Sequence, residues 1–134
     1  MNDRYLYRAK RKNWRELPKD KWWVEGYYAY MQPYHYIMPK DNFDSWIEID
    51  EKTLCACTGL KDKNGKLIWE NDIVNVSTNK GNTLCQVRYA DSVAQFQLWQ
   101  SKTLHKTSTV LNLGNYREEV CGNRFDTPEL LEVG

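Results

Sequence analysis

Hydrophobic and polar residues alternate with a period of two along much of this chain, and that period is typical of β-strands. In the segment YLYRAKRK, residues 5–12, one face would carry Tyr5, Tyr7 and Ala9 and the other Leu6, Arg8 and Lys10. Residues 46–50 (WIEID) and 94–100 (AQFQLWQ) alternate in the same way. The pattern therefore predicts a half-exposed first strand and further strands at both later segments.

Two aromatic runs follow the first strand, and both are rich in residues that favour β-structure. They are Trp22–Tyr30 and Tyr34–Met38, which join around Gln32-Pro33. Gly26 interrupts the first run, and a glycine inside a strand indicates a bulge or the close approach of another backbone. We therefore expect an aromatic β-hairpin in this part of the chain.

The segment TGLKDKNGKLIWENDIV, residues 58–74, carries the strongest turn signals. Asn64-Gly65 is typical of a type I′ hairpin turn, in which both central residues have positive φ. Glu70-Asn71 supplies a second turn, and Ile73–Val76 then has the composition of a strand. The segment is therefore predicted to be scaffold, in which glycine and asparagine serve backbone angles.

The rest of the chain predicts short strands and one short helix. Strands are expected at 84–89 (LCQVRY), 94–100 and 110–116 (VLNLGNY), with a polar linker at 101–109. Thr127 suits an N-cap and Pro128 the first helical position, so residues 128–132 are predicted to form one or two helical turns. The fold class is accordingly mainly β, with a short C-terminal helix.

Several segments resemble one protein family. TGLKDKNGKLIWENDIV is similar to the YopX family's YTGLKDKNGKEIYEGDIV, and YRAKRK resembles its FRAWDK. The aromatic hairpin region and EVCGNRFDTPELLE resemble two further family segments, the second being EVIGNIYDNPELL. The match runs from about Tyr7 to Glu132 in the right order. Asn71 stands where the family usually has glycine, and Lys10 stands where it has tryptophan, at a position expected on the surface.

The resemblance implies a single YopX-like domain over residues 1–134, from the small proteins that phages and prophages encode. Residues 1–57 would hold the first strand and the aromatic hairpin region, and residues 58–134 a barrel-like region with the helical turn. In this fold the DIV strand, residues 72–74, opens a small, partly open SH3-like barrel. The strand–loop–strand–strand order after residue 72 agrees with such a barrel.

Composition restricts the classes of function. The formal charge is only +1, which argues against a nucleic-acid or membrane footprint spread over the whole chain. No apolar run approaches the roughly 18 residues of a membrane span. The N-terminus lacks the apolar core of a secretory signal. We therefore expect a cytoplasmic protein with no membrane partner, and the phage resemblance implies that this is the host bacterial cytoplasm.

The four cysteines admit two interpretations. Cys55 and Cys57 would point to one face of a strand, and a metal site could be completed by Cys85, Cys121, His35 or His105. None of the four lies in a C-x-x-C motif. Buried small hydrophobic side chains are the favoured interpretation, because cysteine is buried so often. No metal and no cofactor is expected.

Motifs for catalysis are missing from the sequence. It contains no glycine-rich phosphate loop, no H-E-x-x-H and no G-x-S-x-G. Asp62, Glu70 and Asp72 lie close together in the sequence but lack the further ligands of a calcium loop, so they are interpreted as turn carboxylates in solvent. His35 could act as a base, but spacing assigns it neither a nucleophile nor an orienting acid. We therefore expect that the protein is not an enzyme.

Two kinds of binding remain open. The basic N-terminus could track a phosphate backbone and stack bases, or its charges could protect a solvated strand edge. The candidate residues are Arg4, Arg8, Lys10, Arg11, Lys12, Trp14 and Arg15. The aromatic hairpin could bind a second copy or a host protein, or it could enclose a second small core. Its candidate residues are Trp22, Trp23, Tyr27, Tyr28, Tyr30, Tyr34 and Tyr36.

The favoured hypothesis is a non-enzymatic interaction module that self-associates or binds a host protein. The phage origin that the resemblance implies suggests that such a module could interfere with a host defence system. The alternative is a nucleic-acid-binding accessory protein that uses the basic N-terminus. Added salt separates the two, because contacts to phosphate weaken steeply with salt and an aromatic interface does not.

Overall fold

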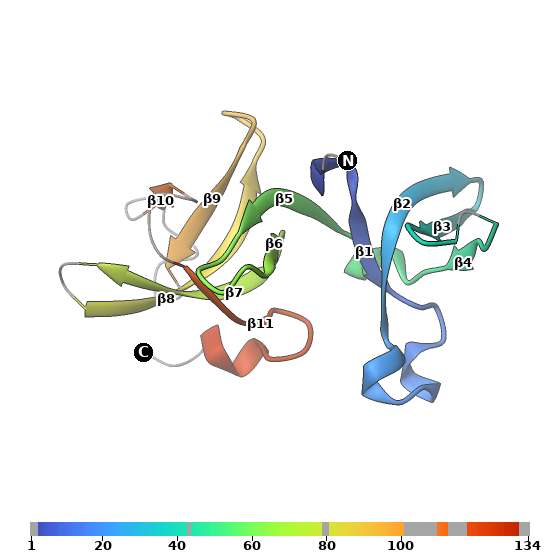
Figure 1. Ribbon diagram of the computed structural model, residues 1–134, viewed down its shortest axis with the longest axis horizontal. Coiled ribbons are helices and arrows are strands. Elements are labelled where there is room, and N and C mark those ends of the chain that lie inside the picture. Colours follow the sequence, from blue (N-terminus) through green and yellow to red (C-terminus); the bar gives the residue numbers. More distant parts are fainter. Residues whose placement is uncertain (1–2, 43, 79–80, 101–109, 113–117, 132–134) are drawn as a thin grey trace. The chain divides into compact units, whose positions relative to one another are not determined.

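The computed structural model describes residues 3–42, 44–78, 81–100, 110–112 and 118–131. Within these ranges every regular element is a β-strand or a short 3-10 helix, and there is no α-helix (Figure 1). The predicted mainly β class is confirmed. The chain forms two compact units, Met1–Cys57 and Thr58–Gly134, which are described in turn.

The N-terminal unit is built on antiparallel strands. They are β1 (Tyr7–Lys10), β2 (Trp23–Met31), β3 (Tyr34–Pro39), β4 (Ile47–Glu48) and the start of β5 (Cys55–Lys61). The 3-10 helices are η1 (Asp3–Tyr5), η2 (Trp14–Glu16), η3 (Lys19–Lys21) and η4 (Glu51–Thr53). The sheet has the order β4-β3-β2-β1-β5-β6, in which β6 is Leu67–Trp69. The predicted aromatic hairpin is confirmed as β2–β3.

One face of this sheet carries the core of the unit. Cross-strand pairs set Ala9 opposite Val24 and Tyr28 opposite Ile37, and successive side chains alternate between faces. Ala9, Val24, Ile37 and Ile49 form the buried cluster. The opposite face, which we call the outer face, therefore receives the side chains at the odd positions of β2 and the even positions of β3.

The backbone of β3 lies very close to Gly26. A Cβ atom on Gly26 would lie 2.7 Å from the carbonyl carbon of Met38 and 2.8 Å from Cα of Pro39, closer than real Cβ atoms come to backbone. The β2–β3 register begins at the pair Gly26–Pro39 and continues to Met31–Tyr34. The expected close approach is confirmed, because a side chain would not fit at this first pair of the hairpin.

The C-terminal unit contains the second sheet, in the order β10-β9-β8-β7-β11. Its strands are β7 (Asp72–Thr78), β8 (Gly81–Ala90), β9 (Gln95–Gln100), β10 (Val110–Asn112) and β11 (Glu119–Asn123). The buried cluster of this unit includes Ile68, Val74, Val87 and Leu98. Neighbouring strands pair antiparallel, and among the described residues the strands do not close into a barrel.

The turn between β5 and β6 differs from the prediction. Gly65 has φ 84°, whereas Asn64 is not among the residues with positive φ, so the type I′ assignment was wrong. Asp62 and Asp72 were expected in solvent, but both are buried. The Asp62 carboxylate organises the loop, because Oδ1 accepts from the backbone N–H of Asn64 at 2.8 Å and of Lys66 at 2.9 Å. Its Oδ2 accepts from the N–H of Val120 in β11 at 3.0 Å.

Two other local predictions can be compared with the structure. Asn71 has φ 72°, so the positive-φ turn before β7 is confirmed. The terminal helical turn is the 3-10 helix η6 (Pro128–Leu131) rather than an α-helix. The Thr127 hydroxyl bonds the backbone of Asn123 in place of the expected N-cap bond, accepting from its N–H and donating to its carbonyl, both at 3.1 Å. The linker 101–109, His105 and residues 113–116 lie outside the described residues.

Replacing Gly26 with alanine should destabilise the N-terminal unit. The new Cβ would overlap the Met38–Pro39 backbone, and overpacking of this kind costs roughly 1–3 kcal/mol. Urea unfolding followed by tryptophan fluorescence measures the loss. Gly65→Ala is a comparison for backbone strain alone, because its added Cβ meets no atom within 4 Å but a side chain at φ 84° itself costs about 1–2 kcal/mol. Equal stability of Gly26→Ala and the parent would contradict the close approach.

The Asp62 carboxylate should make stability depend on acid. Burial alone would raise its pKa, but the N–H groups of Val120, Lys66 and Asn64 and the Lys66 charge together hold the pKa below its usual value. A lowered folded pKa gives stability that is present above the unfolded value and lost as pH falls through the folded value. We expect Asp62→Asn to cost about 1.5–3 kcal/mol at pH 7.

As pH falls below the ordinary carboxyl pKa, the unfolded parent takes up a proton that folded Asp62 resists, so the parent loses stability and its difference from Asp62→Asn should shrink. Urea unfolding at neutral pH and near pH 3 measures both values. The exposed Asp41→Asn is the control. A difference that stays constant with pH would show that the Asp62 charge contributes nothing.

Candidate interaction surface

Lys10 is buried, with 2% of its surface exposed, so its expected surface position was wrong. Its Nζ lies 3.9 Å from the ring centroid of Trp14, 4.4 Å from that of Trp22 and 5.5 Å from that of Trp23. The first two rings meet edge to face at 4.8 Å. Ring faces attract a cation and cover its aliphatic chain, so the three tryptophans make this burial possible.

The neighbouring arginines also make contacts inside the unit. Arg11 Nη1 donates to the carbonyl of Lys21 and, at 3.3 Å, to that of Trp23. The Arg8 guanidinium lies 4.8 Å from the Trp23 ring. Among the nucleic-acid candidates, Lys10, Arg11, Arg8 and Trp14 are therefore engaged with the protein itself.

The other three basic candidates are exposed. Arg4, Lys12 and Arg15 reach solvent, and Arg15 lies over the Trp14 ring at 4.3 Å. The structure therefore does not gather the predicted basic residues into one open stripe.

Lys10 and the tryptophans Trp14, Trp22 and Trp23 form what we call the Lys10 cluster. Its indole N–H groups also have partners. Trp22 Nε1 donates to the Leu17 carbonyl at 2.9 Å, and Trp14 Nε1 donates to the Asp50 carboxylate at 3.2 Å. Trp22 and Trp23, which were candidates for a partner interface, are thus partly buried around Lys10. This cluster forms a small second centre of packing that holds η2 and η3 against β1 and β2.

A hydrogen-bonded network lies at the edge of the core face. The Tyr28 hydroxyl is 2.6 Å from His35 Nδ1, and His35 Nε2 contacts the Glu51 carboxylate. Tyr30 packs on the imidazole with ring centroids 4.7 Å apart. Burial, followed by the charge of Glu51, raises the pKa of Tyr28, which makes its hydroxyl a poor nucleophile near neutral pH.

Sequence reasoning missed this network. The hairpin register explains half of it, because Tyr30 pairs with His35 and Tyr28 is two residues further along the same face. Glu51 comes from a separate 3-10 helix, and no pattern in the sequence links it to His35.

The outer face of the hairpin carries a row of exposed large side chains, which we call the aromatic ladder. Its members are Met31, Tyr34, Tyr36 and Trp46. Met31 is 58% exposed, Tyr34 50% and Trp46 45%, and Tyr36 is partly buried between them. Ring centroids are 6.4 Å apart for Tyr34 and Tyr36 and 5.6 Å for Tyr36 and Trp46. Tyr27 lies on the same face and is partly buried.

Polar groups accompany the ladder. In the part of the chain that the structure describes, no hydrogen bond engages Trp46 Nε1 or the hydroxyls of Tyr34 and Tyr36. Glu48 pairs with Tyr36 across β3 and β4, and the exposed Asp44 precedes Trp46 by two residues. Trp46 was absent from the predicted interface, although its alternation with Ile47 placed it on the opposite face from a core residue.

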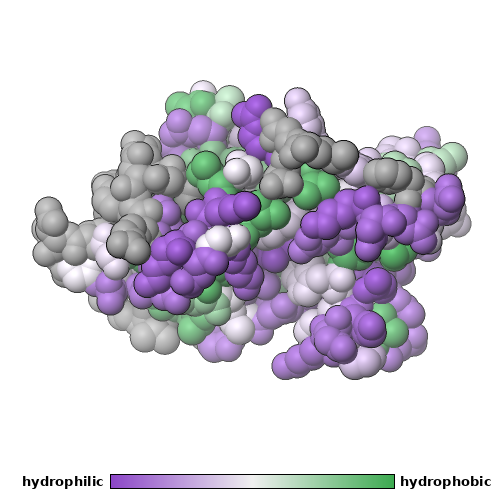
Figure 2. Space-filling view, viewed as in Figure 1, coloured by the Kyte–Doolittle hydropathy of each residue, from purple (hydrophilic) through white to green (hydrophobic). Residues whose placement is uncertain are grey.

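Exposed hydrophobic side chains are fewer in the C-terminal unit. Leu60, Tyr89 and Val93 are the large ones there among the described residues. Tyr89 packs on Phe96. In the view of Figure 2, hydrophilic residues cover much of the surface and hydrophobic residues form small separate patches. The ladder therefore stands out by its row of adjacent rings rather than by hydropathy.

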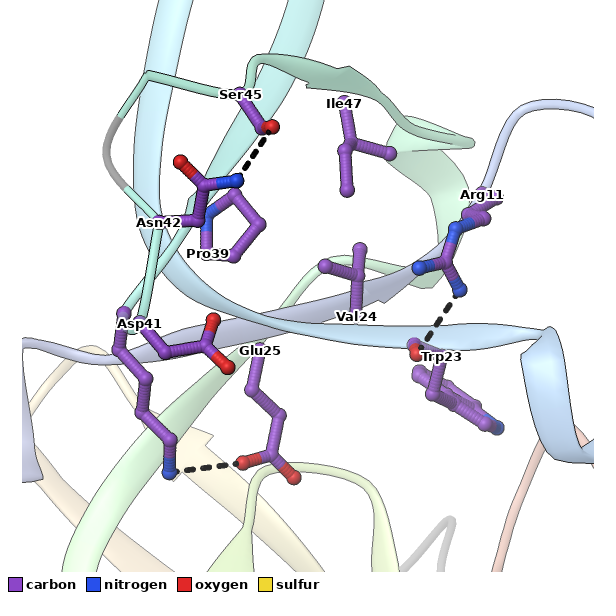
Figure 3. Close-up of a pocket in the computed structure, with 10 residues that line it drawn as sticks. Arg11, Trp23, Val24, Glu25, Pro39, Asp41, Asn42, Ser45 and Ile47 are labelled. Atoms are coloured by element: carbon purple, nitrogen blue, oxygen red, sulfur yellow. Dashed lines mark hydrogen bonds and ion pairs between the residues drawn. The ribbon is translucent and has the colours of Figure 1, made fainter.

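A cavity of about 710 Å³ opens in the N-terminal unit. Val24, Pro39 and Ile47 supply apolar walls, and Arg11 points into it from one side (Figure 3). Glu25 and Lys40 pair across its rim at 3.4 Å. Asn42 donates to Ser45 Oγ at 3.0 Å, and this bond fixes the turn that leads into Trp46. The lining includes no pairing of a nucleophile with a base.

The cysteine interpretation is decided for most positions. Cys55, Cys57 and Cys85 are buried, as the favoured interpretation expected, whereas Cys121 is exposed. Burial, with the nearby Glu118 charge, raises the pKa of Cys85 to about 11. In the described ranges, no three His, Cys, Asp or Glu side chains gather as metal ligands would. No described helix is long and apolar enough to cross a membrane.

Reversing the charge of Lys10 should destabilise the N-terminal unit. A carboxylate at this position would face the negative ring faces of Trp14 and Trp22, so Lys10→Glu should cost more than about 2 kcal/mol. The exposed Lys12→Glu makes the same charge change and should cost less than about 0.5 kcal/mol. Thermal unfolding followed by tryptophan fluorescence distinguishes them. Similar losses in both variants would contradict the buried position of Lys10.

Comparison with known proteins agrees with the motifs. Residues 4–132 match the family model described as YopX protein. None of the curated proteins searched matches the chain. The matched range includes the aromatic ladder, the Lys10 cluster and both sheets, and the chain belongs to the YopX family.

Proposed function

We propose that this protein is a non-enzymatic interaction module that binds a second copy of itself or a host protein through the aromatic ladder. The observation that supports this is the exposure of Met31, Tyr34 and Trp46 beside a core that is complete without them. The buried cluster of the unit consists of alanine, valine and isoleucine side chains, with Tyr28 at its margin.

The composition of the ladder suits a protein interface. Tyrosine and tryptophan bury a large area at low entropic cost and are the residues that most often dominate binding energy. Burying one such side chain contributes up to about 3 kcal/mol. Ring contacts with Tyr36 on both sides hold the exposed Tyr34 and Trp46 in place, so less side-chain freedom is lost on binding.

Family membership supplies the setting of the proposal. The YopX resemblance implies a product of phage or prophage genes that acts in the host bacterial cytoplasm, where interference with host defence is one use for such a module. We also interpret the C-terminal unit as a partly open, SH3-like barrel built on β7, β8 and β9. Such a barrel would serve as scaffold, because small barrels host many unrelated functions.

Nucleic-acid binding is the alternative. Arg4, Lys12 and Arg15 are exposed and would supply the phosphate contacts. Lys10, Arg11 and Trp14 make contacts within the protein. The basic surface that could contact a nucleic acid is therefore smaller than the sequence predicted. Each phosphate contact would contribute to a steep loss of affinity with salt.

Light scattering with two matched double variants tests the proposal. If the protein self-associates, the parent should have a mass that is a fixed multiple of 16.0 kDa, insensitive to salt and to a short DNA duplex. Tyr34→Ser with Trp46→Ser should reduce it to the monomer. Tyr89→Ser with Val93→Ser removes exposed apolar side chains from the other unit and should leave it unchanged.

If the parent is a monomer, the same variants decide whether a host protein binds at the ladder. A host protein retained from a bacterial lysate by the parent and by the control, but not by the ladder variant, would support the proposal. A DNA complex at low salt that requires Arg4, Lys12 and Arg15 and ignores the ladder variant would contradict it.

A further inference from the structure

We propose that the aromatic ladder binds a proline-rich peptide in the polyproline II conformation, with a basic residue at one end of the peptide. This inference rests on the proposed function, because it names the partner of the same surface. Four features of the ladder carry it: the spacing of its rings, its unpaired hydrogen-bond donors, its acidic margin and its narrowness.

The row of rings has the right length for such a peptide. Tyr34 and Tyr36 are inclined by 55°, and Tyr36 and Trp46 meet nearly edge to face at 69°, so the row presents a ridged surface rather than a flat stack. From Tyr34 to Trp46 the row spans at most about 12 Å between ring centroids. At about 3.1 Å per residue, this is the length of about four polyproline II residues, one Pro-x-x-Pro unit.

The hydrogen-bonding groups of the ladder complement this conformation. A polyproline II backbone has no internal hydrogen bonds, so its carbonyl oxygens need outside donors, and proline has no N–H to offer in return. The ladder presents donors, namely the Trp46 indole N–H and the Tyr34 and Tyr36 hydroxyls, which have no partner in the described part of the chain. A peptide bound as an extended β-strand would also bring backbone N–H groups, and the side chains of the ladder offer these few acceptors.

Charge selects a basic flank on the peptide. Asp44 is exposed two residues before Trp46, and Glu48 stands beside Tyr36 across the β3–β4 pair. Lys40, the closest lysine in sequence to Asp44, is engaged with Glu25. The margin of the ladder near Trp46 is therefore acidic, and an arginine or lysine next to the prolines would be attracted to it.

The chain itself does not provide the occupant. Its four prolines, Pro18, Pro33, Pro39 and Pro128, stand too far apart to form a Pro-x-x-Pro unit. A second copy fits less well than a peptide, because a stable dimer buries about 800 Å² on each partner. The ladder is a single row of four side chains, which suits a narrow ligand.

Fluorescence anisotropy with three labelled peptides tests the proposal. The first contains two Pro-x-x-Pro units and a terminal arginine, the second has alanine at every proline, and the third has glutamate in place of the arginine. The parent should bind the first peptide, with the other two weaker by roughly tenfold and about threefold. Equal binding of the first two peptides would overturn the proposal.

Variants of the protein locate the site. Trp46→Ser should weaken binding of the first peptide roughly tenfold. Asp44→Lys, at an exposed position that cannot affect folding much, should weaken it about threefold and reverse the preference between arginine and glutamate. Tyr89→Ser with Val93→Ser should change neither. If Trp46→Ser and Asp44→Lys both bind the first peptide as tightly as the parent does, the peptide binds elsewhere and the inference is overturned.

Failure of this inference can be distinguished from failure of the proposed function. If no proline-rich peptide binds, but Tyr34→Ser with Trp46→Ser still abolishes self-association or capture of a host protein, the inference is wrong and the interaction module stands. A dimer that Trp46→Ser dissociates and that the peptide does not displace would identify a second copy as the occupant, with the same consequence. If the ladder variant changes neither peptide nor protein binding, both proposals fail.

Discussion

The close backbone approach at Gly26 is the constraint on which the N-terminal unit depends. It lies at the first β2–β3 pair, from which an unbroken register runs to Met31–Tyr34, and strand geometry assigns alternate residues of this hairpin to opposite faces. Burial of Val24 and Ile37 in the core consequently directs Tyr34 and Tyr36 to the outer face. The exposed ladder is thus a geometric consequence of the core that the same hairpin builds.

Two aromatic clusters of this unit differ because of what covers them. At one end of the hairpin, η2 and η3 bring Trp14 and Trp22 over the outer-face residue Lys10. The attraction between its ammonium group and the ring faces allows Lys10 to be buried there. At the other end no described element covers Tyr34 and Trp46. The same kinds of side chain therefore stabilise the fold in one place and are exposed in the other, where we propose that a partner binds.

Local features of the fold could be predicted from the sequence, and those that join distant segments could not. Period-two alternation located most strands, and Gly26 and Asn71 behaved as their backbone requirements indicated. The prediction of a type I′ turn at Asn64 was wrong because the Asp62 carboxylate accepts the backbone hydrogen bonds of this loop in place of a type I′ turn. The predicted surface position of Lys10 was wrong because three tryptophans from different parts of the chain surround it. The alternating pattern of a strand indicates only that a lysine is exposed.

The candidate site was predicted in part, since the aromatic hairpin was identified but Trp46 and the His35 network were not. That network has a structural role at the hairpin tip. An ionised carboxylate can only accept, so the His35 nitrogen facing Glu51 donates to it, and the other ring nitrogen hydrogen-bonds the Tyr28 hydroxyl. The raised pKa of Tyr28 keeps that hydroxyl protonated, so the network acts as a brace. Tyr30 packs on the imidazole and adds to this brace, and in the interaction that we propose for the opposite face a braced tip would lose less entropy on binding.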